Sequence, residues 1–436
     1  MIQQPISPCN RTGEVNMSLR TLSVRIFSCA LSILVVGSRA HGAEPLTLEA
    51  VQTAALELQP LVEGQRAKVD ALRERAVVAG ELPDPELGIG INEMPVDTAD
   101  AWSLSRDSDT DVMVGFTQNF PGGDKRRLRA LREQQASQAA EEEMHDLELR
   151  IRRDAGLAFA EVFLRQHQVE LVAEEVRQAA LQKKAADIRF RSGGAAQSEL
   201  LAASVEEALL GDKLAESRQM LAHARIQLER WVGTMAGQPA GDRLPELGLD
   251  KDFPRIVEGL SDHPAIRMED RAREAAEAGV DLALQGNRPD WRLEVAYGHR
   301  PEFSEMLTVR ASVGLPIFPR QRQDREAAAA RHDVSAAVSM RANRLREFKA
   351  EAALAHHDGT VFSERLRALK ADALPTARAR VDAADAAYRT GQGALAEVLA
   401  ARRSRLDVQL RQLELEVSAF REQIELQYFM NPGAQP

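Results

Sequence analysis

The sequence predicts a mainly α-helical protein with a small β part, built from two copies of one unit that contains long coiled-coil helices and two strands. The first observation is a stretch without proline from Asp124 to Arg191, long enough for a helix of roughly 100 Å. The second is a set of four short segments in which apolar and polar residues alternate. The third is an internal repeat. Aromatic residues make up only 4% of the 436 residues, which favours long helices over a compact enzyme core.

The repeat appears as three motifs that recur in the same order. Two of them recur at an offset of 198 residues: Phe120-Pro121 as Phe318-Pro319, and Phe190-Arg191-Ser192-Gly193 as Tyr388-Arg389-Thr390-Gly391. Upstream of both, Leu82-Pro83-Asp84-Pro85-Glu86-Leu87 is echoed by Arg288-Pro289-Asp290-Trp291-Arg292-Leu293. We therefore expect a first repeat over residues 44–240 and a second over 241–430, followed by a tail at 431–436.

Residues 1–43 have the features of a secretory signal peptide. Arg20 and Arg25 precede an apolar run at 26–36, and small residues follow it. Cleavage is expected after Ala43 or after Ala40, and Met17 is an alternative start. No later apolar run approaches the 18 residues that a membrane-spanning helix needs.

Cysteine usage and charge exclude several classes of protein. Cys9 and Cys29 both lie in the leader, so the mature chain is expected to have no disulfide and no cysteine metal site. Lipidation of Cys29 is an alternative, although Phe27 stands where a small residue is wanted. The formal net charge of −10 argues against a nucleic-acid partner.

The four alternating segments predict strands with one apolar and one polar face. Such strands fit either a soluble sandwich or a membrane barrel, but four strands cannot close either structure alone. The leader favours the barrel, and since open edges are not tolerated in hydrocarbon, other copies must complete it. Three copies would supply twelve strands around a water-filled lumen. The apolar positions are Leu87, Ile89 and Ile91; Val112, Val114 and Phe116; Trp291, Leu293, Val295 and Tyr297; and Leu307, Val309, Ala311 and Val313.

Each repeat should continue into a hairpin of two helices. Residues 47–80 and 253–285 are expected to be helical, and a second hairpin helix spans about 196–233. The closing helix has apolar residues at heptad spacing (Leu399, Leu406, Leu413 and Phe420), which predicts coiled-coil packing. Pro375 predicts either a kink in the other helix of this hairpin or a helix end with a short linker.

The order of these motifs, and their occurrence in two copies, resemble the sequence pattern of the TolC-type outer-membrane efflux channels. The resemblance rests on Leu82-Pro83-Asp84-Pro85, Gly115-Phe116-Thr117-Gln118-Asn119-Phe120-Pro121, Lys125-Arg126, and the stretch from Leu374-Pro375 through Tyr388–Gly391 to Glu397-Val398-Leu399-Ala400-Ala401. The chain departs from the family pattern at Gly122-Gly123, where one glycine more often runs directly into Lys-Arg, and at Gln197-Ser198-Glu199, where an aspartate is common.

The resemblance implies a homotrimer in the outer membrane of a Gram-negative cell. Its twelve-stranded transmembrane β-barrel, in contact with lipid, would continue as a trimeric α-barrel in the periplasm. The trimer would be the passive exit duct of a tripartite system, working with a periplasmic adaptor and an inner-membrane RND-type transporter, with no cofactor. The stretches 82–92 and 115–126 look most like the heavy-metal branch. Drug or solvent export and type I secretion are the alternatives.

The helical turns would form a tip that is closed like an iris and docks the adaptor. The docking residues implied are Arg191, Ser192, Gly193, Gly194, Arg389, Thr390, Gly391 and Gln392. Four acidic residues near the tip are candidates for an acidic ring at the gate: Glu199, Asp382, Asp385 and Glu397. Arg389 is expected to pair with an acidic group near the tip, because the second turn brings Asp385 and Glu397 within a few helical turns of it.

Other functions have weaker support. His356-His357-Asp358 is expected to be helix surface, because adjacent helical residues diverge by 100° and no partner follows at i+4. Gly122-Gly123-Asp124-Lys125 lacks the glycine spacing of a phosphate loop. We expect no catalytic residue. A periplasmic adaptor, which has a single hairpin, and a soluble coiled-coil protein, which lacks leader and strands, are the competing classes.

Overall fold

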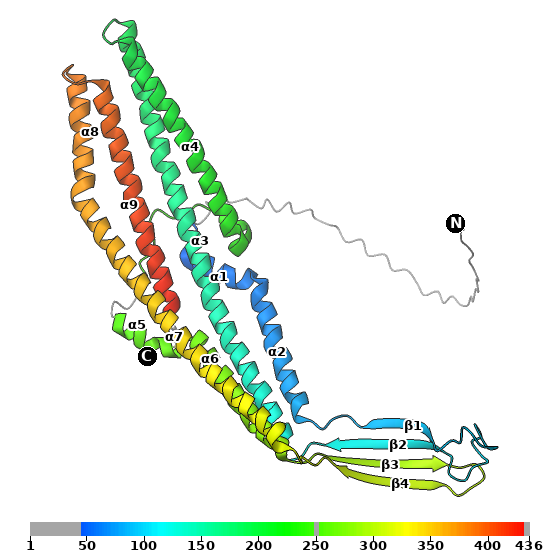
Figure 1. The fold of residues 1–436 in the computed structure, drawn as a ribbon. Helices are drawn as coiled ribbons and strands as arrows, with labels where there is room; N and C mark the ends of the chain where they lie inside the picture. The colour runs from blue at the N-terminus through cyan, green and yellow to red at the C-terminus, as the bar shows by residue number, and fades with distance from the viewer. Residues whose placement is uncertain (1–44, 248–252, 431–436) are drawn as a thin grey trace, which may run out of the picture. The chain divides into compact units, whose positions relative to one another are not determined.

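The computed structural model describes residues 45–247 and 253–430. It contains long helices and one sheet, in the order that the sequence predicts (Figure 1). The predicted leader with Met17, its cleavage sites and Cys29, and the tail at 431–436, lie outside the described residues.

The same series of elements occurs twice along the chain. The first series is α1 (Leu48–Leu58), α2 (Pro60–Gly80), β1 (Glu86–Asn92), β2 (Asp111–Phe120), α3 (Lys125–Arg191), α4 (Gln197–Val232) and the short turn η1 (Gly233–Gly237). The second is α5 (Phe253–Gly259), η2 (Leu260–Asp262), α6 (Pro264–Leu284), η3 (Gln285–Asn287), β3 (Trp291–His299), β4 (Met306–Val313), η4 (Pro319–Gln321), α7 (Gln323–Ala368), η5 (Leu369–Ala373), α8 (Leu374–Arg389) and α9 (Leu395–Phe429).

Prolines divide the helix that begins each series. Gln59 and His263 are extended, with ψ of 115° and 139°, and each precedes the proline that opens the next helix. A residue before proline is driven away from helical geometry, and proline suits a first helical position because it has no N–H to satisfy. The predicted helices at 47–80 and 253–285 are therefore each present in two parts.

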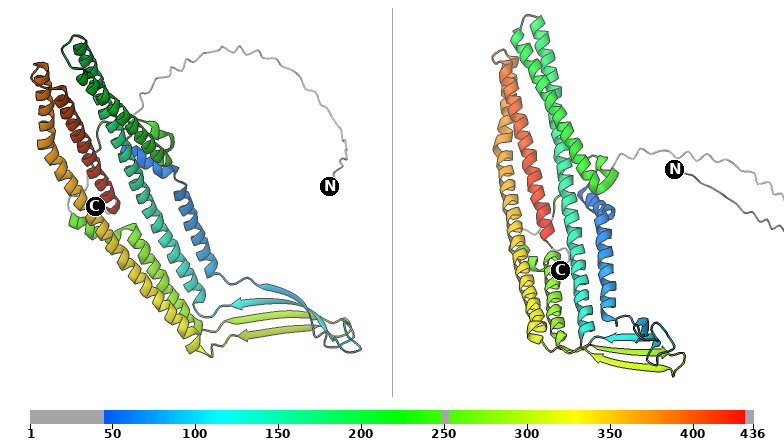
Figure 2. Two further views of the ribbon diagram at one scale, coloured as in Figure 1. Left: turned by 45° about the horizontal axis from the view of Figure 1, so that its top comes forward. Right: turned by 45° about the vertical axis from the view of Figure 1, so that its right-hand side comes forward.

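The predicted long helix is confirmed as α3, whose 67 residues correspond to roughly 100 Å. It begins five residues after β2 and ends at the first hairpin turn, so this one helix joins the sheet to a tip. Helices α2 and α6 run beside α3, and α6 also runs beside α7 (Figure 2).

The main core lies where α1, α3, α4 and α9 meet. The heptad residues Leu406, Leu413 and Phe420 of α9 are buried, and so are Val417 and Ile424 between them. The coiled-coil pattern of the sequence is thus the packing face of α9, as predicted.

The helical path continues through Pro375. Residues Leu369–Ala373 form a wider π turn, and Pro375 lies in the first turn of α8. A π turn is a common cause of a kink, and here it precedes a residue that cannot donate the usual helical hydrogen bond. Of the two alternatives predicted for Pro375, the structure has the irregular turn within a continuous helical path and not the helix end with a short linker.

A second core joins the start of α6 to the end of α9 around His263. The Nε2 atom of His263 lies 3.0 Å from the carbonyl oxygen of Tyr428, and Nδ1 accepts a hydrogen bond from the N–H of Ala265. The Tyr428 hydroxyl donates to Asp146 at 2.7 Å. Because the ring uses Nδ1 as an acceptor, it caps α6 only while it is neutral.

Protonation of His263 is therefore expected to destabilise the fold at mildly acid pH. Burial lowers the pKa of His263; the contact with Tyr428 and the charge of Asp146 oppose this, and Arg344 and Arg267 add to it. The unfolded chain then binds the proton first, so stability should be constant above about pH 6.5 and fall below it by up to about 1.4 kcal/mol per pH unit.

Thermal melting of the detergent-solubilised protein between pH 7.5 and 5 measures this dependence. His263→Asn keeps a capping oxygen and does not titrate, so it should flatten the slope. His332→Asn, at an exposed position of α7, is the control and should keep the wild-type slope. An unchanged slope in His263→Asn would refute the role of His263.

Candidate functional site

The first candidate surface is the sheet, which has the order β1-β2-β3-β4 and is antiparallel throughout. In the register, Leu87 lies opposite Phe116, Phe116 opposite Val295, and Val295 opposite Val309. The predicted apolar positions of the four strands therefore share one face, which confirms their assignment. Most of these side chains are exposed, including Leu87, Ile89 and Leu307, each of them more than 70% exposed.

The opposite face is polar or small apart from two methionines, Met113 and Met306, on either side of Gly298. Gly88 lies opposite Gly115, Thr117 opposite Glu294, and Glu294 opposite Arg310, to which it forms an ion pair of 3.1 Å. β1 and β4 have no further strand beside them in the described chain. The sheet thus has two chemically distinct faces and two open edges.

An ion pair between the buried Lys125 and the exposed Asp290 fixes the junction between the sheet and the helices. The carboxylate of Asp290, just before β3, accepts from the N–H of Gly122 at 2.6 Å and from Lys125 at 2.7 Å. Lys125 also donates to the carbonyl of Arg288. Burial raises the pKa of Asp290, but these two donors outweigh it and hold the pKa below its usual value. The second repeat is thereby clamped to the first.

The two glycines that depart from the family pattern belong to this junction. A Cβ on Gly122 would lie 1.9 Å from the carbonyl oxygen of Pro289, and Gly123 has a φ of +62°. Neither position accepts another residue without a backbone shift. The sequence analysis identified the repeated motif that contains Asp290 and the Lys125-Arg126 motif separately, but it did not predict that Asp290 and Lys125 are in contact.

Removing the lysine of this junction is expected to destabilise the protein. Lys125→Ala removes two hydrogen bonds, to Asp290 and to the carbonyl of Arg288, made by a side chain that is only 10% exposed. Their loss should cost about 1–2 kcal/mol and lower the melting temperature in detergent. Arg127→Ala is the control, because its ion pair with Asp124 is exposed on both sides and should cost less than about 0.5 kcal/mol. Equal melting temperatures for the two variants would show that the junction is not a clamp.

The second candidate surface is the pair of hairpin turns, which have the same local geometry. Gly193 and Gly391 have φ of +74° and +77° and donate to the carbonyls of Phe190 and Tyr388. This is a left-handed helix cap, a conformation that glycine adopts without strain. Three of the eight predicted docking residues are glycines. Arg191, Ser192 and Thr390 contact only their own helices, through Asp187 and through backbone carbonyls. All eight are exposed.

The four predicted gate residues do not form one cluster in a single chain. Asp382 and Glu397 are exposed and make no ion pair with any described residue. Glu199 lies between the hairpins, where its carboxylate is 3.4 Å from the Tyr388 hydroxyl. The Arg189 guanidinium lies over the Tyr388 ring at 4.6 Å, so this tyrosine joins α8 to both helices of the first hairpin.

The expected ion pair of Arg389 with Asp385 or Glu397 is not formed within the described part of one chain. Asp385 instead binds Arg402 of α9 at 3.0 Å, in a contact where both side chains are less than a quarter exposed. Arg389 is exposed and has no ion-pair partner among the described residues. Asp385 lies about one turn before Arg389 on α8 and points to α9, where Arg402 competes for it.

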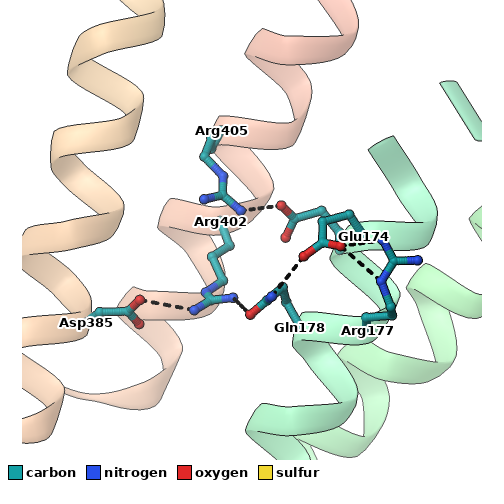
Figure 3. Close-up of polar contacts among 7 residues, drawn as sticks. Glu174, Arg177, Gln178, Asp385, Arg402 and Arg405 are labelled. Carbon is teal, nitrogen blue, oxygen red and sulfur yellow. Dashed lines mark hydrogen bonds and ion pairs between the residues drawn. The ribbon is translucent and has the colours of Figure 1, made fainter. Parts of the chain in front are cut away.

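Three arginines of α9, absent from the sequence prediction, hold the two hairpins together. Arg402 also donates to Gln178 of α3, and Gln178 donates to Glu174, so a chain of polar contacts runs from α8 to α3 (Figure 3). Arg405 pairs with buried Glu175 of α3, and Arg403 pairs with buried Glu206 of α4. The sequence feature that could have predicted these contacts is the run Arg402-Arg403-Ser404-Arg405 between Leu399 and Leu406. Charged residues that flank a heptad core reach neighbouring helices.

The outer side of the first hairpin exposes an apolar stripe. Leu201, Val205 and Leu209 follow one another at every fourth residue of α4 and are each more than half exposed, and Leu181 and Ile188 of α3 are similarly exposed. This stripe lies outside the described cores. A contact with another protein surface would bury it.

No group of three or more His, Cys, Asp or Glu side chains is arranged to hold a metal ion in the described part of the chain. His356 stacks on Phe253 at the helix surface. Within residues 45–247 and 253–430, no helix is both long and apolar enough to cross a membrane.

Comparison with known proteins identifies the fold. No family sequence model matches the chain, and no curated protein sequence does. Solved structures do match: the CmeC outer membrane channel of Campylobacter jejuni (13% identity, 88% of this chain and 85% of that chain, TM-score 0.74). The outer membrane protein VceC of Vibrio cholerae matches with 19% identity and a TM-score of 0.71, over 87% of this chain and 94% of that chain. CusC, studied for transmembrane channel formation, matches with 17% identity and a TM-score of 0.73, over 88% of this chain and 92% of that chain. The chain therefore has the fold of the TolC-type outer-membrane efflux channels.

Proposed function

We propose that the chain is the outer-membrane exit duct of a tripartite efflux system, conducting substrates passively and catalysing no reaction. The observation that carries this proposal is the sheet, with one continuous apolar face, one polar face and two open edges, joined directly to helices long enough to extend far from a membrane. A water-soluble sheet would cover that apolar face, whereas lipid covers it in an outer-membrane barrel. The sheet would lie in the outer membrane and the helices in the periplasm.

A homotrimer satisfies both open edges. β1 and β4 run in opposite directions, so β4 of one copy can pair with β1 of the next in the antiparallel sense that the sheet already has. Three copies give twelve strands with no free edge, as hydrocarbon requires. Trp291 and Phe120, which lie opposite each other at one end of the apolar face, and Tyr297 nearer the other end, occupy positions where such barrels carry aromatic girdles.

The same trimer would bury the apolar stripe of the first hairpin. Since the inner side of that hairpin already packs on α8 and α9, its outer side faces away from its own chain. In the trimer, the second hairpin of a neighbouring copy would pack on this outer side, as α8 and α9 of the same chain pack on the inner side. The result is a continuous α-barrel. A periplasmic adaptor of the competing class would have one hairpin, and this chain has two.

The tips are proposed to dock the periplasmic adaptor, which connects the duct to an inner-membrane RND-type transporter. Both turns present glycine and short polar side chains at the surface, so that backbone groups are accessible. The eight residues named for this role are Arg191, Ser192, Gly193, Gly194, Arg389, Thr390, Gly391 and Gln392.

Fractionation and mass measurement test the duct. The mature protein should be extracted from outer membranes only with detergent, and its mass in detergent should be that of three chains. A stable folded monomer with full helical circular dichroism in dilute detergent would overturn the proposal, because a single chain leaves its edges and its stripe uncovered.

An acidic ring at the tip is expected to make the duct cation-selective. Asp382 and Glu397 carry unpaired carboxylates in the described chain, and three copies of each around an axis would attract cations. The double variant Asp382→Ala, Glu397→Ala should therefore lower the cation-to-anion permeability ratio in planar bilayers. Glu414→Ala, at a paired position farther along α9, is the control and should leave the ratio unchanged. No change in the double variant would exclude these two residues from the pore.

For the substrate, we propose divalent heavy-metal cations, with organic drugs or solvents as the second candidate. The support is the likeness of stretches 82–92 and 115–126 to the heavy-metal branch. A strain that lacks the chain should become sensitive to metal salts and be rescued by it. Sensitivity to detergents and dyes alone would favour the second candidate, and loss of a secreted protein would favour type I secretion.

A further inference from the structure

The two ends of the sheet that remain open carry opposite charge. The segment that enters β1, Glu81–Glu86, contains three acidic residues and no basic one. The segment that leaves β4, residues 314–322, contains Arg320 and Arg322 and no acidic residue. All five charged side chains are exposed, and none forms an ion pair with another residue of the described chain.

The internal junction of the chain is a template for how such ends meet. There, Asp290 at the entrance of β3 accepts hydrogen bonds from Gly122 and Lys125 at the exit of β2. By the sequence repeat, Asp84 is the counterpart of Asp290, since each follows a proline just ahead of a strand. The exit of β4, residues 319–323, is the counterpart of residues 121–125. These two counterparts lie at opposite edges of one chain, so only two different copies can bring them together.

The second junction cannot repeat the first atom for atom. Gly122 has no space for a Cβ, because that atom would lie 1.9 Å from the oxygen of Pro289. The equivalent position in the second repeat is Arg320, and the equivalent of Lys125 is Gln323. The chain that leaves β4 must therefore stay farther from the entering strand, and a long cationic side chain has to span the gap. Arg320 and Arg322 flank Gln321 at the turn η4, where two such side chains are present.

We propose that Asp84 of one copy forms an ion pair with the Arg320/Arg322 pair of the next copy, completing between subunits the junction that Asp290 and Lys125 make within each chain. This inference rests on the proposed assembly and names the residues that select its register. The opposite charges also discourage the like-with-like contact of two β1 edges, each bearing three carboxylates.

Charge reversal and charge exchange test the pairing. In the full chain, Asp84→Arg should reduce the fraction of trimer that survives dilution in detergent by about tenfold, since three pairs become repulsive at once. Arg320→Asp with Arg322→Asp should do the same, and the triple variant should restore the trimer. Asp97→Arg, an exposed and unpaired position beyond the other end of β1, is the matched control.

Cross-linking supplies an independent readout. In a Cys9→Ser, Cys29→Ser background, no other native cysteine exists, so Asp84→Cys with Arg322→Cys carries the only thiols. A short bis-maleimide should convert this variant to covalent dimers and trimers, but not the variant Asp97→Cys with Arg322→Cys. A normal trimer that shows neither cross-link nor rescue overturns this pairing and leaves the proposed duct intact. The absence of any oligomer in the unmodified chain overturns the duct, and this pairing with it.

Discussion

The double variant Arg402→Ala, Tyr388→Phe is expected to raise the conductance of the isolated channel in planar bilayers. Arg402 bridges Asp385 of α8 to Gln178 of α3, and the Tyr388 hydroxyl reaches Glu199 of α4. The contacts with Gln178 and Glu199 tie the second hairpin to the first near the tip, whereas Asp385 holds the Arg402 side chain from within the second hairpin. If the tip is a closed iris, opening it moves the hairpins apart and these contacts are lost.

The expected size of the effect follows from the trimer. Hydrogen bonds that involve charged groups are worth about 1.5–3 kcal/mol when sheltered from water. The two contacts that join the hairpins, Arg402 with Gln178 and Tyr388 with Glu199, are only partly sheltered, so we assign about 1 kcal/mol per copy to their combined loss. Three copies together then shift the closed-to-open equilibrium by about 3 kcal/mol, which is roughly a hundredfold change in the open fraction. This shift is large enough to appear in single-channel recordings.

A matched control separates gating from general destabilisation. Arg411→Ala removes an arginine from the same helix, but its pair with Glu414 is exposed and joins residues of one helix face. It should leave conductance and trimer content unchanged. If the wild-type channel already conducts as an open pore, or if the double variant forms normal trimers with wild-type conductance, these contacts do not hold a gate.

The sequence predicted the elements of the fold better than the contacts of the site. Strand faces follow from alternation alone, and so the whole apolar face from Leu87 to Val313 is placed correctly. Heptads likewise predict which side of α9 is buried. Both patterns depend on residues close together in the sequence, where geometry is fixed by the strand or helix itself.

Contacts between distant helices were not predictable in the same way. Asp385 can reach several arginines, and the choice of Arg402 over Arg389 depends on how α8 faces α9. The meeting of Lys125 with Asp290 depends on β2 and β3 being neighbours, although about 170 residues separate them in the chain. Charged side chains are long and exposed to competition, so spacing along one helix does not select their partners.

The two faces of the sheet are expected to respond in opposite ways to the same new charge. Val309→Arg places a guanidinium in the middle of β4 on the apolar face, which should cost about 2–4 kcal/mol against lipid and reduce the amount of assembled trimer in the outer membrane. Leu293→Arg lies nearer the helical end of its strand, so its cost should be smaller, because the penalty falls toward the membrane surface.

Ser312→Arg provides the matched comparison on the polar face. That face already carries Arg292, which lies opposite Ser312, and the pair of Glu294 with Arg310. An added arginine there would face water, and assembly should be normal, as measured by heat-modifiable trimer on gels of outer-membrane fractions. If Val309→Arg and Ser312→Arg assemble to the same extent, the apolar face of the sheet does not meet lipid, and the sheet does not line a membrane pore.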